Sequence, residues 1–258
     1  MNKSVYTKFV FSQPMLATWA VCCIAFGVSI SLVGVDKGWI NFVGGAKKED
    51  TPINSGDTQD AKEQARITDM LLNTRAAKEC MGNPNEWKRV PYFWPIGRDP
   101  GRKGPAAFVP GLLHGPDKLS VEPIAFINRD RKQFVILVHL GKSLCGHDGI
   151  IHGGVQATLL DEFTARPAFW NLPRNIALTA NLKINYRRPV VANQVLVFRT
   201  QLVEMEGRKA KIAATLEDTS GNILTDAESL YISPNNEKLL MDHSSEIKKI
   251  ENVYPGNF

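Results

Sequence analysis

The sequence predicts an α+β domain, and three observations indicate this fold class. Six apolar or alternating segments of strand length follow Pro123, at residues 124–127, 134–140, 178–186, 195–203, 209–216 and 223–232. Polar or glycine-containing turns, such as 128–132 and 220–222, separate several of them, as is typical of hairpins. A single segment among them, from residue 152 to about residue 169, has instead the period of a helix.

The length and composition fit one globular domain with appendages. The chain has 258 residues, and domains commonly contain about 100 to 200. Hydrophobic residues make up 43% and charged residues 22%, which excludes collagen-like, coiled-coil and wholly disordered chains. The net charge of +5 suits anionic ligands or surfaces but is too small to indicate nucleic acid. The four cysteines have neither zinc-site spacing nor the density of a disulfide scaffold, so no metal is expected.

The N-terminal region, residues 1–43, contains an uncharged stretch of membrane-spanning length. Residues 15–35 (MLATWAVCCIAFGVSISLVGV) carry no charge over 21 positions, and a helix of that length crosses a hydrocarbon layer of about 30 Å. We predict a targeting segment with a single transmembrane anchor; a removed targeting segment and a buried helix are the alternatives. The basic flank without an acid before Asp36 is typical of mitochondrial presequences and also suits an endoplasmic-reticulum anchor. A single-pass mitochondrial membrane protein is therefore expected, with the endoplasmic reticulum as the alternative and the orientation open.

A tether and a helix are predicted next. Residues 44–60 are rich in Gly, Lys, Asp, Ser and Thr, which indicates a solvated tether. An amphipathic helix is predicted over 61–81, before Gly82 and Pro84, because apolar or weakly polar positions recur every three or four residues (Ala65, Ile67, Met70, Leu71, Thr74 and Ala77).

The rest of the segment 61–120 predicts an extended strap. Seven prolines between 91 and 123 exclude a helix of useful length. Four aromatic residues favour a strap laid over a core, with an exposed loop as the alternative (Trp87, Tyr92, Phe93 and Trp94). The strand-rich domain is placed at 121–232, and the tail at 233–258 is expected to form a short helix around 238–250.

The central helix has a face of large residues and a face of small ones. Large apolar residues four apart form a ridge (Ile151, Val155, Leu159 and Phe163). Small residues on the opposite side allow close approach of a ligand, and Asp161 is the only carboxylate among them (Gly154, Ala157, Thr158, Asp161 and Ala165). Because an ionised carboxylate in apolar surroundings is costly unless compensated, Asp161 is a candidate catalytic residue. A surface cap or ion pair is the alternative.

A glycine-rich turn, residues 146–154, leads into the helix and contains His152, Gly153 and Gly154. Backbone N–H groups at a helix N-terminus lack partners within the helix and favour negative charge. They therefore suit a carbonyl oxygen that gains charge during a reaction. The alternative is an ordinary turn.

The strand predicted at 178–186 alternates, with Thr179, Asn185 and Arg187 on one face. A zone rich in Lys and Arg extends from it to Lys211, which suits a phosphate or diphosphate. A solvated charged surface is the alternative.

Three motifs together resemble those of a known family. The segments GHDGIIHGGVQATLLDE (146–162), LTANLKINYRRP (178–189) and EGRK (206–209) are similar to the hotdog-fold acyl-CoA thioesterases. They are most similar to the PaaI-like branch, which includes the mitochondrial thioesterase-superfamily members. The resemblance covers residues 121–232 and implies an antiparallel sheet wrapped around the helix. It also implies a homodimer or dimer of dimers with active sites at the subunit interface.

The resemblance implies roles for particular residues. Asp161 would act as general base or nucleophile, His152 and Gly154 with Gly153 would position and polarise the thioester carbonyl, and Thr179 would help to hold the attacking water. Gly153 and four further residues match family positions that line the binding path of the CoA part of the substrate. These four are Asn185, Arg187, Glu206 and Arg208. The segment 166–170, with Pro167 and two large rings, departs from the family pattern and is expected to end the helix and reshape the acyl pocket.

The predicted function is hydrolysis of acyl-CoA to free acid and CoA by a membrane-anchored enzyme. This chemistry needs no metal or redox cofactor, and CoA is part of the substrate. The alternative is a catalytically silent, membrane-tethered protein of the same fold that binds acyl-CoA or serves assembly. The long N-terminal half outside the resemblance favours that alternative, whereas the presence of Asp161, His152 and Thr179 together favours the enzyme.

Overall fold

The computed structural model describes residues 32–36, 39–42, 56–92, 108–235 and 248, and the chain divides into two units, residues 1–54 and 55–258. In the first unit, β1 (Leu32–Asp36) pairs antiparallel with β2 (Trp39–Phe42). The last residues of the predicted anchor, 32–35, therefore form a strand rather than a helical turn, since the β-branched Val33 and Val35 favour extended structure. Residues 15–31 lie outside the described residues. Among the described residues, no helix is both long and apolar enough to cross a membrane.

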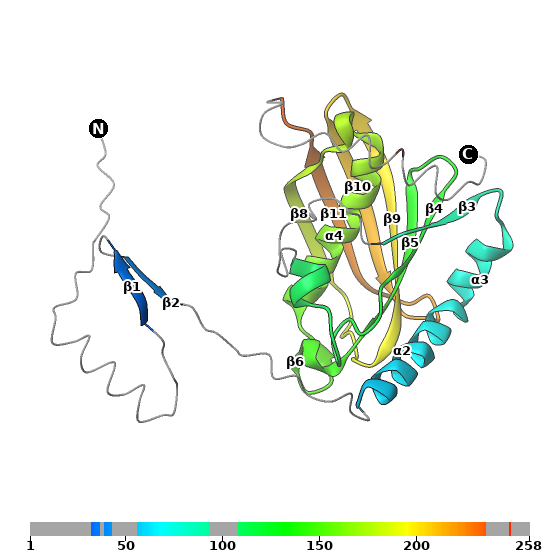
Figure 1. Cartoon of the computed structure of the whole chain (residues 1–258). Coiled ribbons are helices and arrows are strands. Elements are labelled where there is room, and N and C mark those ends of the chain that lie inside the picture. The colour runs from blue at the N-terminus through cyan, green and yellow to red at the C-terminus, as the bar shows by residue number, and fades with distance from the viewer. Residues whose placement is uncertain (1–31, 37–38, 43–55, 93–107, 236–247, 249–258) are drawn as a thin grey trace. The chain divides into compact units, whose positions relative to one another are not determined.

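The second unit contains a seven-stranded antiparallel sheet with the order β3-β4-β5-β9-β10-β11-β8 (Figure 1). Its strands are β3 (Trp87–Val90), β4 (Ile124–Asn128), β5 (Gln133–Leu140), β8 (Leu178–Tyr186), β9 (Gln194–Glu206), β10 (Lys209–Glu217) and β11 (Ile223–Ile232). The six strands predicted from periodicity are confirmed. β3 was not predicted: the Trp87 and Val90 of the expected strap form an edge strand that pairs with β4.

One face of the sheet packs against α4 (Gly153–Asn171), as Figure 1 shows. Leu159, Leu160 and Phe163 of α4 are fully buried against inward residues of β5 and β9, such as Ile136 and Phe198. Each fully buried side chain of this kind contributes about 1.5 to 3 kcal/mol to stability. The central helix is therefore the predicted one.

The predicted end of this helix, within the segment 166–170, is close to the observed one, because α4 continues through Pro167 and ends at Asn171. Ala168 and Trp170 beyond the proline are buried, and their burial offsets the one backbone hydrogen bond that proline removes. The Asn171 amide also donates to the Pro167 carbonyl at 2.8 Å.

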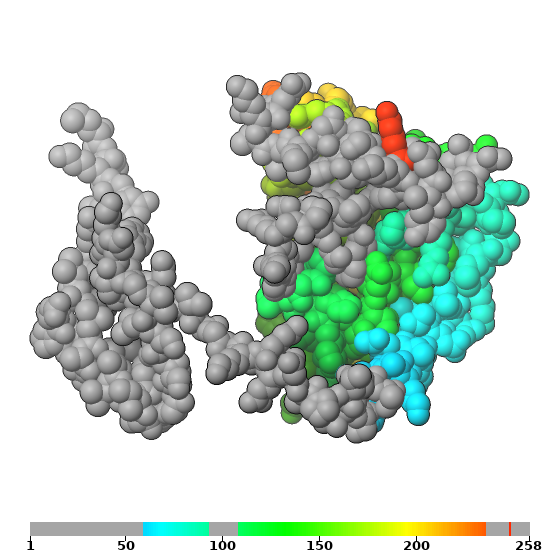
Figure 2. All heavy atoms as spheres, viewed as in Figure 1, coloured from blue at the N-terminus to red at the C-terminus, as the bar shows by residue number. Residues whose placement is uncertain are grey.

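Two helices cover the other face of the sheet, α2 (Gly56–Leu72) and α3 (Arg75–Gly82). Leu71 and Cys80 pack with Phe126 and Val135 in a second apolar cluster, and Figure 2 shows α2 and α3 in cyan along one side of this unit. The prediction of one helix over 61–81 is wrong at its middle. The Thr74 side chain accepts from the Ala77 N–H at 3.2 Å and caps α3, so the helix restarts there.

The predicted boundaries of the flanking segments also change. α2 begins at Gly56, inside the predicted tether 44–60; Asp57 and Asp60 near its start favour a helix N-terminus. Tyr92 of the predicted strap is buried and contacts Phe163 edge-to-face at 5.3 Å. Phe93 and Trp94 lie outside the described residues. So does the predicted tail helix 238–250, apart from the helical Lys248.

Short elements connect α4 to the sheet. β6 (Cys145–His147) and β7 (Ile150–Ile151) form a small hairpin just before α4, with Gly149 at a φ of 73° in its turn. This hairpin is the predicted glycine-rich turn. The remaining elements are a π-helical turn (Phe108–Leu112) and two 3-10 turns (Lys142–Leu144 and Pro173–Asn175).

Candidate active site

His152 caps the N-terminus of α4 with its own side chain. Its Nδ1 accepts from the Gly154 N–H at 2.8 Å, and its backbone is extended with φ −57° and ψ 133°. A Cβ atom on Gly154 would lie 2.9 Å from this Nδ1, and one on Gly146 would lie 2.7 Å from Cδ2 of the same ring. Both glycines are therefore needed for the imidazole to occupy this place.

The cap changes which glycine can polarise a carbonyl. Because the Gly154 N–H already donates to His152, the prediction that Gly154 polarises the thioester carbonyl is wrong for this arrangement. Within the described part of the chain, the Gly153 N–H has no acceptor. It is the first amide of α4, where the helix dipole favours negative charge. Gly153 is therefore the candidate oxyanion donor.

A cavity of about 500 Å³ lies in front of this amide. His152 and Gly153 line it together with residues of the β6–β7 hairpin, α4 and the end of β8 (Gly146, His147, Ile150, Ile151, Gln156, Tyr186, Arg187, Arg188 and Pro189). The cavity joins a helix N-terminus to two arginines, which suits a polar ligand with negative charge.

Asp161 lies farther along α4, half-buried and facing β8. Its Oδ1 accepts from the Thr179 hydroxyl at 2.9 Å. No hydrogen bond from the described residues reaches Oδ2. The structure therefore joins Asp161 to Thr179, as two members of the predicted site, and leaves one carboxylate oxygen for a water molecule.

Tyr231 of β11 belongs to this group and was missed in the sequence. Its side chain is buried, and its hydroxyl donates to the Asp161 carbonyl at 2.7 Å and lies 3.3 Å from Oδ1. Burial raises the pKa of Tyr231 well above its usual range, so the hydroxyl keeps its proton. Strand alternation puts Tyr231 on the inward face with Thr225, Ala227 and Ser229, and a large hydroxyl-bearing residue at the end of that face is the signal that could have identified it.

The prediction that Thr179, Asn185 and Arg187 share one face is wrong. The pairing of β11 with β8 passes from Leu230↔Asn181 to Tyr231↔Thr179, so β8 has one extra residue there. A bulge of one residue moves the following side chain to the other face. Thr179 therefore points toward α4, while Asn185 lies on the outer face.

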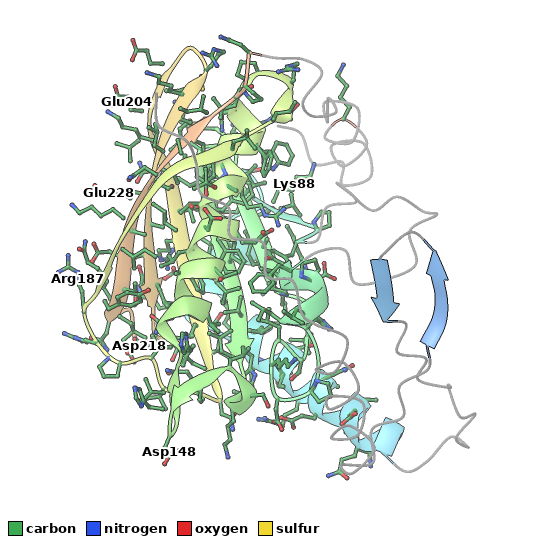
Figure 3. All side chains as sticks on the ribbon, turned by 90° about the vertical axis from the view of Figure 1, so that its left-hand side faces the viewer. Lys88, Asp148, Arg187, Glu204, Asp218 and Glu228 are labelled. Atoms are coloured by element: carbon green, nitrogen blue, oxygen red, sulfur yellow. The ribbon has the colours of Figure 1, made fainter. Side chains whose placement is uncertain are left out.

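Asn185 and Arg187 converge on Asp226 of β11. The Asn185 amide donates to Asp226 Oδ1 at 2.8 Å, and Arg187 forms an ion pair with Oδ2. The hydrogen bond from Arg187 lowers the pKa of Asp226 below its usual range. Figure 3 shows Arg187 and Glu228 directed away from α4. The structure thus brings these two predicted CoA-binding residues together and adds Asp226 to them.

Glu206 and Arg208 lie at the opposite end of the sheet. They belong to the β9–β10 turn, where Arg208 donates to the Ser233 carbonyl at 2.6 Å. Figure 3 shows Glu204, close to this turn, far along the sheet from Arg187. The predicted basic zone is also partly neutralised, since Arg187, Arg199 and Lys211 are in ion pairs. Within one copy, these CoA-binding candidates do not form one site.

The same separation holds for the catalytic candidates. Gly153 and Asp161 are eight residues apart in α4, which places them about 12 Å apart along the helix axis. A thioester whose carbonyl oxygen lies within about 3 Å of the Gly153 N–H is therefore too far from Asp161 of the same copy. A water molecule held by that Asp161 cannot attack its carbonyl carbon. The residues that line the cavity accordingly do not include Asp161.

A second cavity, of about 190 Å³, lies between α2 and the end of β5 and is lined by His139, Glu63 and Arg66, among others. His139 is only 5% exposed, and neither ring nitrogen has a hydrogen-bond partner among the described residues. The pKa of His139 is lowered, mainly because the side chain is buried. The positive charge of Arg66 lowers this pKa further, whereas the negative charge of Glu63 raises it.

Replacement of this histidine is expected to change the pH dependence of stability. Because the pKa of His139 is lower in the folded than in the unfolded chain, folding is favoured fully above the ordinary pKa of about 6.5 and less as pH falls below it. The loss cannot exceed about 1.4 kcal/mol per pH unit. We expect His139→Leu to lose less unfolding free energy than wild type between pH 7 and pH 5, measured by urea unfolding. Parallel losses in both proteins would contradict the assignment.

Comparison with known proteins agrees with the motifs. A family model described as the thioesterase superfamily matches residues 148–225, which contain α4, β8, β9 and β10. The UPF0644 protein PB2B4.06 of Schizosaccharomyces pombe is 30% identical over 186 residues, which are 69% of this chain and 69% of that protein.

Two further relatives match a shorter segment. The acyl-coenzyme A thioesterase THEM4 of Rattus norvegicus is 36% identical over 123 residues, 47% of this chain and 52% of that protein. The uncharacterized mitochondrial membrane protein FMP10 of Saccharomyces cerevisiae is 37% identical over 112 residues, 43% of this chain and 46% of that protein. The chain spans about half the length of these two curated relatives.

Proposed function

Because the chain belongs to the thioesterase superfamily, we propose that it hydrolyses acyl-CoA to free acid and CoA. The family and its thioester-hydrolase class agree with the prediction from the motifs. The observation that carries the proposal is the half-buried Asp161 carboxylate, which Thr179 holds at 2.9 Å through one oxygen and leaves open at the other. The relative named acyl-coenzyme A thioesterase supports the choice of substrate class.

The hydrogen bonds of Asp161 define a place for water. Thr179 has one hydroxyl proton and donates it to Asp161 Oδ1, so its oxygen can only accept from a water molecule. A water that donates to both Thr179 Oγ1 and Asp161 Oδ2 keeps a lone pair for the thioester carbon. As general base, Asp161 takes the proton of that water while the C–O bond forms; the C–S bond then breaks and CoA leaves as a thiol after it gains a proton. Direct attack by Asp161 as nucleophile gives the same products through an acyl-enzyme.

A second copy of the chain supplies the polarising amide. β8 lies at the edge of the sheet, and Leu178 and Tyr186 at its two ends are exposed. Antiparallel pairing of two β8 strands about their middle places the Thr179 end of one strand opposite the Asn185 end of the other. The Asp161 of one copy then faces the Gly153 N–H of the other. Arg187 of one copy likewise approaches Glu206 and Arg208 of the other, along the path proposed for CoA.

The direct test is thiol release by the full chain from acyl-CoAs of short to long chain length. Turnover of at least one of them is expected, without added metal or redox cofactor. Binding of acyl-CoA with no turnover of any chain length would overturn the enzyme and leave a silent binding or assembly protein.

We also propose a mitochondrial membrane location. The uncharged residues 15–31 still reach the lower limit of about 17 residues for a spanning helix, and the relative FMP10 is named a mitochondrial membrane protein. Alkaline carbonate extraction of mitochondria is expected to leave the protein in the pellet. Its release into the supernatant would remove the anchor.

A further inference from the structure

Tyr186, the last residue of β8, is connected to His152 through a backbone peptide. Its hydroxyl donates to the Gly153 carbonyl at 2.9 Å. The same peptide group carries the Gly154 N–H, which donates to His152 Nδ1 at 2.8 Å. The hydroxyl, the peptide and the imidazole therefore form one continuous chain of hydrogen bonds, in which each bond polarises the next and strengthens it by about 10 to 30%.

This chain selects one form of the imidazole. A neutral histidine has one ring nitrogen that donates and one that accepts. Because Nδ1 accepts from Gly154, the proton of the neutral ring lies on Nε2. The ring is also held in place at its edge, since the Gly146 backbone approaches so closely that a Cβ there would lie 2.7 Å from Cδ2.

The two residues at the ends of this hydrogen-bond chain, Tyr186 and His152, line the same cavity. His152, Gly153 and Tyr186 are all among the residues around the space of about 500 Å³ at the start of α4. The Gly153 N–H and the His152 Nε2–H thus belong to two adjacent residues that line this cavity at a helix N-terminus, a place that suits a carbonyl oxygen gaining negative charge in the transition state.

We propose that Tyr186 is a positioning residue that holds His152 as the Nε2–H form, so that His152 donates a hydrogen bond to the thioester carbonyl and does not act as a base. This inference rests on the proposed function. Neither glycine of the Gly153–Gly154 peptide has a side chain of its own, and the Tyr186 hydroxyl holds the carbonyl of this peptide while His152 accepts from its N–H. Tyr186 acts through this peptide and not on the substrate itself.

The test is Tyr186→Phe in the full chain, which removes the hydroxyl and keeps the ring. Loss of one hydrogen bond in the chain is expected to lower kcat about tenfold with little change in KM. The second readout is the imidazole ¹⁵N spectrum of protein labelled at histidine. The chain has five histidines, and His152→Asn assigns the signals of His152. In wild type these signals are expected to show a protonated Nε2 and a bare Nδ1, and in Tyr186→Phe they are expected to shift toward exchange between the two forms.

Tyr231→Phe is the matched control. It removes a hydroxyl at the Asp161 end of the site, so it is expected to lower kcat without changing the ¹⁵N signals of His152. If Tyr186→Phe leaves these signals as in wild type, the proposal is overturned whatever its activity. If wild type hydrolyses no acyl-CoA, the proposed function fails, and the ¹⁵N spectra still decide whether Tyr186 holds the imidazole.

Discussion

Asp161→Asn is expected to lower kcat for acyl-CoA hydrolysis by about 10²- to 10⁴-fold, the usual contribution of a general base. Asparagine keeps the shape of the side chain and its oxygen still accepts from the Thr179 hydroxyl, which donates at 2.9 Å in wild type. It cannot take a proton from water at neutral pH or form an acyl-enzyme. The fold and the binding of CoA should therefore remain, and the chemical step should be lost. Steady-state thiol release gives kcat, and calorimetry with CoA gives the affinity.

Glu162→Gln is the matched control for this variant. Glu162 is the next residue of α4, and it pairs with Arg166 at 2.6 Å rather than with Thr179. We expect folded Glu162→Gln to keep turnover within about threefold of wild type, because Glu162 pairs with Arg166 and makes no hydrogen bond to Asp161 or Thr179 among the described residues. The cost of this variant falls on stability instead, since Arg166 is buried and loses its anionic partner. An equal loss of kcat in Asp161→Asn and Glu162→Gln would contradict the role of Asp161, because it would show that activity depends only on a negative charge somewhere on α4.

Gly153→Pro is expected to lower kcat by about 10²- to 10³-fold, since it deletes the proposed oxyanion donor. Proline removes the N–H, and it is well tolerated at the first position of a helix. The preceding His152 already has φ −57° and ψ 133°, the extended conformation that a following proline requires.

Gly153→Ala tests whether the N–H group or the absence of a side chain is important at this position, because it adds a Cβ and keeps the N–H. A Cβ at this position would meet the Tyr186 ring at 3.5 Å, an ordinary contact, and the N–H remains. Near-normal kcat for Gly153→Ala beside a large loss for Gly153→Pro is the expected pair of results, with unfolding temperatures measured for both. If the alanine variant loses activity as well, the loss in Gly153→Pro would result from crowding by the added side-chain atoms and not from removal of the N–H group.

The local pattern of apolar and polar residues was enough to predict six strands of the sheet and the central helix α4. The strand at 223–232 and the helix around Asp161 were predicted because each has one buried face. The strand at 178–186 alternates in sequence, although its residues are exposed or half-buried in one copy. β3 was missed because Trp87–Val90 is short and followed by proline, and only its pairing with β4 makes it a strand. The break at Thr74 was missed because threonine fits an apolar stripe as well as it fits a cap.

The site itself depended on features that no local pattern contains. Thr179 was predicted to act beside Asp161 and does hydrogen-bond to it, but the bulge that turns it toward Asp161 is set by pairing with β11. Tyr231 and Asp226 come from that strand, more than 60 residues after Asp161, and tertiary contacts alone bring Tyr231 to the carboxylate. The preference for Gly154 failed because the His152 side chain, not the helix, decides which amide is free.

The most direct measurement is the activity of a hybrid dimer made from one Asp161→Asn copy and one Gly153→Pro copy, purified through two different tags. Each parent dimer is expected to be inactive. In the hybrid, one site receives both substitutions and the other receives neither, so about half of the wild-type activity per dimer should return. A hybrid as inactive as its parents, with the dimer confirmed by mass, would contradict a site that joins the carboxylate of one copy to the helix amide of the other.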